Sequence, residues 1–319
     1  MVARVENMGR RSRLADYGPT YGAAAALVLL VAANVIFTPN FADLNNLRNI
    51  LLQVAPTALV AVGMTFVIST GGIDLSVGSV MAIASATAAV MLPSGVGLSF
   101  ALALLVSLAV GAFNGALISI FRIQPIIVTL ALLISGRGVA QVISRGGDLI
   151  EFQNPAFEYL GKGHVGPFPV QVLVMFAVAA VAFFVMRATA FGRYVAAVGG
   201  NEAAARLSGV KVRRTKIMVY ALSGLLAGLA GLIETARLGA SDAQKVGLNI
   251  ELDAIASVVV GGTPLAGGRC TVAGTLVGAL IMQVITTTIN MRDYPYAWSL
   301  VIKAAIILVA VYIQRPKVA

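Results

Sequence analysis

Long runs of apolar residues, separated by short polar or glycine-rich breaks, make up most of this chain. A hydrocarbon core about 30 Å thick is crossed by about 20 helical residues, and most of the runs have about that length. The pattern predicts an all-α polytopic membrane protein with a single transmembrane domain over residues 1–319. The ten predicted spans lie near 21–38, 50–70, 75–93, 97–121, 123–143, 168–186, 217–236, 252–266, 272–291 and 297–313.

Glycine-rich breaks interrupt two of these runs. Gly71 and Gly72 separate the second and third spans with almost no loop, and Gly261 and Gly262 break the eighth. Each break follows an apolar segment and precedes a helix rich in small residues. We interpret this likeness as two inverted halves, in which spans 2–5 mirror spans 7–10, as in many transporters. Chance similarity between segments rich in glycine and alanine is the alternative.

Asp74 stands directly after the first break, in the stretch GGIDLSVGS. A helix that begins at membrane depth has unpaired N–H groups and little water to satisfy them. We therefore expect the Asp74 carboxylate to accept a hydrogen bond from the N–H of Ser76 or Val77. This interpretation makes Asp74, like the glycines of the two breaks, a structural residue and not a site of proton transfer.

The charge balance agrees with a membrane protein and orients it. The sequence is 59% hydrophobic and 11% charged, whereas soluble domains are roughly 25% charged. With the N-terminus inside, fifteen of the 23 Lys and Arg fall on the cytoplasmic side, as the positive-inside rule expects. Residues 1–20 then form a basic cytoplasmic N-terminus, residues 145–169 an outer loop, and residues 187–216 a cytoplasmic loop.

Several functions are disfavoured by the residues present. The net charge of +10 comes from clusters without interleaved aromatics, which indicates topology and contact with membrane lipids, and no nucleic-acid partner. One cysteine, Cys270, and one histidine, His164, give no basis for a metal cage or a catalytic triad. The segment GTPLAGGR lacks the Lys-Ser/Thr ending of a phosphate loop. We expect no catalysis, metal or cofactor in this chain.

Ionisable side chains within the spans are few, whereas ion-driven carriers and proton pumps normally need them. Arg137, Glu234 and Lys303, besides Asp74, lie near predicted span ends, where snorkelling accounts for them. Neutral polar side chains are the expected lining of a solute path, with interhelical hydrogen bonding as the alternative. They are Gln53, Thr65, Asn114, Gln124, Thr129 and Gln283.

The cytoplasmic loop carries the most specific pattern, RATAFGRYVAAVGGNEAAARLSGVKVRRTK. Asn201 is placed to cap a short helix with Glu202 in its first turn, and Gly209 is placed to end it. Such a helix, lying beneath the membrane between two basic flanks, is suited to dock another protein. A surface helix held against anionic headgroups is the alternative.

Three segments in order, GGIDLSVGS, TAFGRYVAAVGGNEAAARLSGV and ELDAIASVVVGGTPLAGG, resemble the inner-membrane permease subunits of bacterial ABC importers for ribose, xylose and galactofuranose. The resemblance implies a multi-pass protein of the bacterial inner membrane that pairs with a second permease copy or a paralogue. It also implies two cytoplasmic ATP-binding subunits, which contact the cytoplasmic loop, and a periplasmic sugar-binding protein. The loop residues that match the motif are Gly192, Arg193, Asn201, Glu202, Arg206 and Gly209.

The expected function is therefore to form the translocation path for a sugar that a periplasmic protein delivers, with ATP hydrolysed by a separate subunit. The nearest alternative is the same architecture importing branched-chain amino acids or another small polar solute. An autonomous ion-coupled carrier is the alternative from a different class, and it would transport its solute without an ATP-binding partner.

Overall fold

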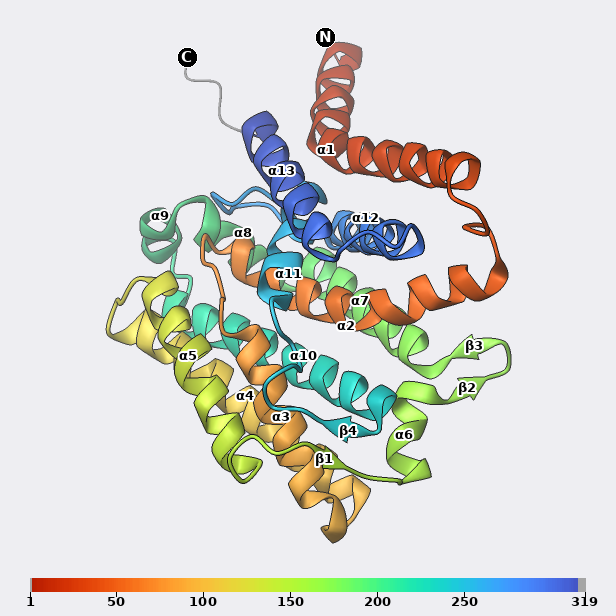
Figure 1. Ribbon diagram of the computed structural model, residues 1–319. Coiled ribbons are helices and arrows are strands. Elements are labelled where there is room, and N and C mark those ends of the chain that lie inside the picture. Colours follow the sequence, from red (N-terminus) through yellow and green to blue (C-terminus); the bar gives the residue numbers. More distant parts are fainter. Residues whose placement is uncertain (1, 315–319) are drawn as a thin grey trace.

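The computed structural model describes residues 2–314, and helices make up most of this part of the chain (Figure 1). The helices are α1 (Val2–Phe37), α2 (Leu44–Ser69), α3 (Val77–Met91), a 3₁₀ turn (Leu92–Ser94), α4 (Val96–Ile120), α5 (Pro125–Ile143), α6 (Pro155–Lys162), α7 (Val170–Ala188), α8 (Ala190–Gly200), α9 (Glu202–Leu207), α10 (Val212–Leu238), α11 (Ile250–Val260), α12 (Val272–Met291) and α13 (Ala297–Gln314). The strands form two antiparallel pairs, β1 (Ile150–Glu151) with β4 (Ala240–Ser241) and β2 (His164–Val165) with β3 (Phe168–Pro169).

Each of the ten predicted spans coincides with a helix. Within the described residues, eight helices are long and apolar enough to cross a membrane. The other two are α13, whose apolar part is Ala297–Tyr312, and α11, which has only 11 residues. The prediction of an all-α polytopic membrane protein is confirmed.

The span predicted for residues 252–266 is wrong at its C-terminal boundary, because glycines end the helix early. α11 stops at Val260, Gly261 follows as its C-cap, and Gly262 has a φ of 96°. Glycine adopts that backbone conformation without strain, whereas other residues do not. Pro264 then lacks the N–H that a continuing helix would use. The predicted glycine break is therefore present, but it terminates the helix.

Loops and short helices gather at two opposite ends of the bundle (Figure 1). We call one the α6 end, which holds α6, the β1–β4 pair and the β2–β3 hairpin. We call the other the α9 end, which holds α8, α9 and residues 261–271. The helix α10 begins beside α9 and ends at β4, so it connects the two ends. The predicted loops 145–169 and 187–216 thus lie at opposite ends, as alternation of the spans requires.

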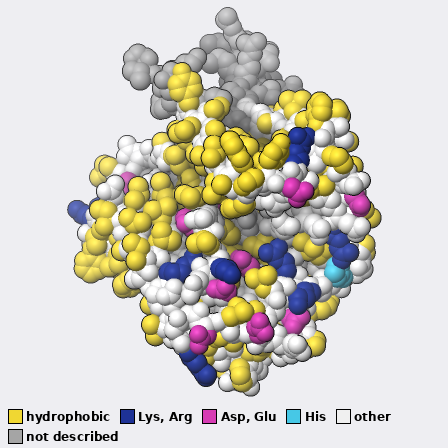
Figure 2. Space-filling view, viewed as in Figure 1, with side chains coloured by type: hydrophobic (Ala, Val, Ile, Leu, Met, Phe, Trp, Pro, Cys, Tyr) yellow, Lys and Arg dark blue, Asp and Glu magenta, His cyan; other side chains and the backbone are white. Residues whose placement is uncertain are grey.

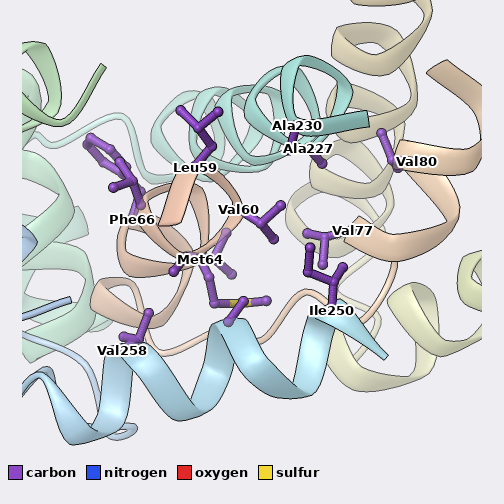
Figure 3. Close-up of a cluster of buried hydrophobic side chains, with 14 of the residues drawn as sticks. Leu59, Val60, Met64, Phe66, Val77, Val80, Ala227, Ala230, Ile250 and Val258 are labelled. Atoms are coloured by element: carbon purple, nitrogen blue, oxygen red, sulfur yellow. The ribbon is translucent and has the colours of Figure 1, made fainter. Parts of the chain in front are cut away.

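The antiparallel helices α2 and α10 form the centre of the bundle. A buried cluster joins them to α3 and α11, and it includes Leu59 and Met64 of α2, Ala227 of α10 and Val258 of α11 (Figure 3). In a membrane such contacts stabilise the fold by close packing more than by removal of surface from water.

Glycines at four-residue spacing bring helices into backbone contact. A Cβ on Gly111 or Gly115 of α4 would overlap backbone atoms of α10, and a Cβ on Gly224 of α10 would overlap α4. Gly278 of α12 lies equally close to Ser257 of α11. These small residues therefore permit the close helix pairs that their spacing predicts.

Two irregular segments enter the bundle from opposite ends. The first re-entrant segment, residues 70–76, joins α2 to α3, and the second, residues 239–249, joins α10 to α11. Because α2 and α10 run antiparallel, the two units have opposite directions, which is the arrangement of inverted halves. The units meet inside the bundle, where Gly78 and Gly247 pack so closely that a Cβ on either would overlap the other.

The glycine-rich segment 261–271 is a neighbour of the first re-entrant segment and not its mirror image. Gly267 lies against Gly71, and the N–H of Gly268 donates to the Ser69 carbonyl over 3.0 Å. The two glycine-rich sequences that share a plan therefore lie side by side at the α9 end. By position in the fold, the counterpart of residues 70–76 is the 239–249 segment, which has a different sequence.

Candidate functional site

Asp74 lies in the first re-entrant segment and is 1% exposed. One carboxylate oxygen accepts from the N–H of Ser76 at 3.0 Å and from its hydroxyl at 2.6 Å. The other oxygen accepts from the hydroxyl of Ser223, near the middle of α10, at 2.8 Å. Asn114 of α4 donates to the Ser76 hydroxyl at 3.0 Å. The predicted bond to the Ser76 N–H is confirmed, although Ser76 and not Asp74 occupies the N-cap of α3.

Arg137 of α5 is hydrogen-bonded to the backbone of the second re-entrant segment. One guanidinium nitrogen donates to the carbonyls of Ala243 and Val246, at 3.1 and 2.6 Å. Near the start of the segment, the hydroxyls of Ser241 and Ser85 are 2.7 Å apart. Snorkelling at a span end is therefore the wrong explanation for Arg137, because its guanidinium is bonded to buried backbone.

A polar cavity of about 160 Å³ opens between the second re-entrant segment and the helices α2, α10 and α11. We call it the charged cavity. Its polar lining consists of Gln53 and Thr57 from α2, Glu234 and Arg237 from α10, Lys245 from the segment and Asp253 from α11. On the face of the molecule that Figure 2 shows, acidic and basic side chains lie close together around a central hollow. Donors and acceptors that converge from four elements suit a small, hydrogen-bonding solute.

Lys303 of α13 supports one wall of the charged cavity. Its ammonium lies 2.9 and 3.0 Å from the two carboxylate oxygens of Asp253, and its side chain is 7% exposed. Removing one partner of such a buried pair is strongly destabilising, because the other charge stays behind unpaired. Pairing with Asp253, and not snorkelling, therefore accounts for Lys303.

The neutral residues predicted to line a path are dispersed. Three of them lie in the packed interior: Thr65 and Thr129 are 0% exposed and Asn114 is 1% exposed. The hydroxyl of Thr65 is 2.8 Å from that of Thr275 in α12, and Thr129 donates to a carbonyl of its own helix. For these three the structure favours the alternative role, that of hydrogen-bonding groups within the bundle.

The other three predicted lining residues are accessible. Gln53 borders the charged cavity and accepts a hydrogen bond from Gln283 of α12 at 2.9 Å. Gln124 is exposed at the N-terminus of α5 and is distant in sequence from Gln53 and Gln283. Of the six residues, Gln53 alone lines the charged cavity.

Sequence reasoning missed the charged residues of this cavity. It explained Glu234 by its closeness to a span end, and it singled out none of Arg237, Lys245 and Asp253. One signal was present in the sequence. Glu234 and Arg237 are three residues apart in a helix and therefore share one face, which is a costly arrangement unless that face is polar.

At the α9 end, side chains cap both short helices. Thr189 accepts from the N–H of Gly192 at 3.4 Å, and Asn201 accepts from the N–H of Ala204 at 2.9 Å. Gly209 follows α9 with a φ of 83°, a conformation that suits glycine. The short helix predicted between Asn201 and Gly209 is confirmed.

Glu202 is the centre of an ion-pair network on α9. Its carboxylate oxygens accept from Arg206 at 3.0 Å and from Lys216 of α10 at 2.6 Å. The hydrogen bond from Lys216 lowers the pKa of Glu202 below its ordinary value of 4.5, because it stabilises the ionised form of the carboxylate. Leu207 is 90% exposed beside this network, and Arg193 is exposed on α8. The two helices thus present exposed apolar side chains, Leu207 and Tyr194, beside charged ones.

The helix α8 also rests on the glycine-rich segments. A Cβ on Gly199 would overlap the Ser69 carbonyl and the N–H of Gly268. The Ser69 hydroxyl donates to the carbonyl of Arg269 at 2.8 Å. The helix α8 is therefore in direct contact with the end of α2 and with the segment that follows α11.

Comparison with known proteins identifies relatives over nearly the whole chain. A family model described as branched-chain amino acid transport system / permease component matches residues 46–311. The chain is 43% identical over 297 residues to the ribose import permease protein of Escherichia coli strain K12, covering 92% of each chain. It is 41% identical over 303 residues to the ribose import permease protein of Bacillus subtilis strain 168, covering 94% of this chain and 92% of that one.

A relative with a different named solute is about as similar. The chain is 40% identical over 302 residues to the galactofuranose transporter permease protein of Escherichia coli strain K12, covering 92% of this chain and 88% of that one. No solved structure matches the chain significantly.

Proposed function

The chain belongs to the family of branched-chain amino acid transport system permease components, and on that premise we propose that it forms the sugar path of an ATP-driven importer in the bacterial inner membrane. The relatives named above are permeases for ribose or galactofuranose. The charged cavity carries the proposal, because its lining supplies donors and acceptors for hydroxyl groups. The solutes named for these relatives favour a sugar over a branched-chain amino acid.

ATP hydrolysis is assigned to separate cytoplasmic subunits that dock on α8 and α9. The support is the exposed surface of these helices and their contact, through Gly199, with the end of α2 and with the segment that follows α11. The proposed docking residues are Gly192, Arg193, Asn201, Glu202, Arg206 and Gly209. The periplasmic sugar-binding protein is then assigned to the α6 end.

A second permease copy or a paralogue is assigned to the face that carries the charged cavity. The cavity opens at the surface of the single chain, between helices that cross the membrane. Charged side chains in contact with lipid cost several kcal/mol each. A partner that covers this face would enclose a water-filled path and remove that cost.

The proposal is tested by reconstituting the chain in liposomes with its ATP-binding subunits and a periplasmic sugar-binding protein. We expect uptake of labelled ribose that requires ATP and all components, and no uptake of labelled leucine. Uptake of leucine would favour the amino-acid alternative. Uptake by the chain alone, driven by an ion gradient, would favour an autonomous carrier.

Docking on α9 is tested by exchanging the charges of one ion pair, with Glu202→Lys and Arg206→Glu in the same chain. We expect weaker co-purification of the ATP-binding subunits, with membrane insertion intact. The matched control exchanges Glu158 and Lys162, another pair four residues apart, on α6 at the other end. Equal co-purification by both variants would contradict the assignment.

The orientation is tested with reporters fused after residue 160 and after residue 205. We expect the first to be periplasmic and the second cytoplasmic, because of the charge asymmetry of the loops. Finding both reporters on one side would contradict the orientation and the number of spans.

A further inference from the structure

A second cavity, of about 260 Å³, lies at the α9 end and is separate from the charged cavity. It is bounded by α1, α7, α8 and the start of α12. Its lining includes Arg187 and Arg193, together with Thr20, Phe183 and Met186. We call it the arginine cavity.

Three membrane spans end at the arginine cavity. Thr20 begins the apolar span of α1, Val272 begins that of α12, and Arg187 is the last residue but one of α7. The cavity therefore lies where apolar helices give way to polar chain, which is the level of the headgroups of one leaflet.

The described lining of the cavity carries positive charge. Among the described residues, no carboxylate lines it, and neither Arg187 nor Arg193 forms a salt bridge with any of them. The guanidinium of Arg187 lies over the ring of Phe183, 5.5 Å from its centroid. This contact restrains one face of the guanidinium and leaves its N–H edges able to donate.

The start of α12 adds to the positive potential. Val272, Ala273 and Gly274 of its first turn line the cavity, and the preceding Thr271 makes no side-chain capping bond. The Thr271 hydroxyl is directed elsewhere, to Thr263 at 2.8 Å. The N-terminal end of a helix favours an anion, but this contribution is secondary to that of the two arginines.

We propose that the arginine cavity binds the phosphate of an anionic phospholipid. A guanidinium fork matches two phosphate oxygens at once, and Phe183, Met186 and Val272 give the glycerol an apolar wall. The volume is below the roughly 300–1,000 Å³ of pockets for drug-sized ligands, so the headgroup enters while the acyl chains lie outside. Phe176 and Phe184 of α7 are exposed for contact with those chains.

Inorganic phosphate has the same charge-bearing group as this ligand, but it is not held at the headgroup level of the membrane. A free ion needs no cavity at the headgroup level and gains nothing from the apolar part of the lining. A bound lipid, in contrast, would tie α7 and α8 together at the helix that also contacts Ser69. The two sources of phosphate are therefore separated by the experiment.

The test is native mass spectrometry of the full chain in detergent, titrated with phosphatidylglycerol or with phosphatidylcholine of the same acyl chains. We expect phosphatidylglycerol to bind at least about tenfold more tightly, because the choline cation of phosphatidylcholine offsets the charge of its phosphate and is repelled by the two arginines. Replacing both cavity arginines, Arg187→Gln with Arg193→Gln, should abolish that preference. The control, Arg213→Gln with Arg214→Gln, removes two charges from exposed positions outside the cavity and should retain it.

The proposal would be overturned by equal affinity for both lipids, by an unchanged preference in the cavity variant, or by an equal loss in the control. Inorganic phosphate that binds the wild type as tightly as phosphatidylglycerol would also overturn it, in favour of the soluble ion. If the cavity variant does not fold, Arg187→Lys takes its place, because it keeps the charge and loses the bidentate fork. We then expect severalfold weaker binding, and unchanged binding would overturn the proposal.

Discussion

The two re-entrant segments occupy related positions in the two halves and have opposite environments. In the first, Asp74 is 1% exposed and both of its carboxylate oxygens are bonded within the bundle. In the second, the side chain of Lys245 is 84% exposed and borders the charged cavity with Glu234. The same topology therefore provides a buried, hydrogen-bonded connection in the first half and one wall of an open cavity in the second. We call the buried connection, residues 70–76, the sealed joint.

This difference shows how to interpret an acid within a membrane span. Asp74 and Glu234 are both carboxylic acids near the ends of predicted spans, and hydropathy does not distinguish them. Their surroundings do: both carboxylate oxygens of Asp74 accept hydrogen bonds inside the bundle, whereas Glu234 faces a cavity shared with Arg237 and Asp253. Hydrogen-bond satisfaction separates a structural acid from one that is available to a solute.

The largest effect is expected where the sealed joint is opened. Asp74→Ala would leave the Ser76 N–H and the hydroxyls of Ser76 and Ser223 buried without an acceptor. Each such group costs about 1–3 kcal/mol, so we expect a loss of at least about 3 kcal/mol and little folded protein. Expression followed by size-exclusion chromatography in detergent measures the outcome.

Asp74→Asn is the matched variant. Its amide oxygen still accepts from Ser76, and its NH₂ group can donate to the hydroxyl of Ser223, so we expect folded protein and most of the transport. Normal folding of the alanine variant would contradict a sealed joint. An asparagine variant that folds and transports nothing would make Asp74 a titrating site.

The contact between the two halves is the next point to test. A Cβ at Gly78 would overlap the backbone of Gly247 and approach Glu251, and overpacking of this kind costs about 1–3 kcal/mol. We expect Gly78→Ala to lower the melting temperature in detergent by several degrees. Gly138→Ala, in α5, meets no atom within 4 Å and should leave it unchanged or slightly raised. Equal melting temperatures for both variants would contradict the close packing of the halves.

The helical framework was predictable because one physical requirement dominates it. A helix needs about 20 apolar residues to cross the hydrocarbon core, and eight helices within the described residues meet this requirement. Helix boundaries were less predictable where a helix continues beyond the membrane. The helix α10 begins at Val212 and not at the predicted residue 217. The prediction started too late because the first turns of the helix contain Arg213, Arg214 and Lys216, which are not apolar. Hydropathy reports where a run of residues is apolar and not where backbone hydrogen bonding begins or ends.

The site was less predictable because it depends on contacts between distant segments. Asp74 and Ser223 are 149 residues apart, and the partners of Arg137 are more than 100 residues away. The local part of each prediction, the Asp74 bond to Ser76 and the Asn201 cap, was readable from neighbouring residues. The charged cavity was not readable, because no single stretch of sequence contains its walls.

The same chemical change at the two acids should have different consequences for transport. Glu234→Gln replaces a charged acceptor with a neutral one beside the charged cavity. Hydrogen bonds to charged groups are stronger by roughly 1 kcal/mol, so we expect about a fivefold increase in the KM for sugar uptake, with a normal amount of folded protein. Asp148→Asn, an exposed acid at the same end and outside the cavity, is the control. A KM that Glu234→Gln leaves unchanged, or that Asp148→Asn raises equally, would remove Glu234 from the solute path.

The smallest effect is expected where Arg137 holds the second re-entrant segment. Arg137 donates to the carbonyls of Ala243 and Val246 from one guanidinium nitrogen, and the ammonium of Arg137→Lys is too short to keep both bonds. Losing one hydrogen bond weakens the local structure by about 1 kcal/mol, which is about a fivefold rise in local opening. Hydrogen exchange should therefore accelerate about fivefold for the amides of residues 243–249 and stay unchanged for residues 70–76. Arg122→Lys, at an exposed arginine near the start of α5, should change neither segment. Faster exchange in both segments of Arg137→Lys would mean that the two segments open as one unit. That result would contradict the difference between the sealed joint and the second re-entrant segment.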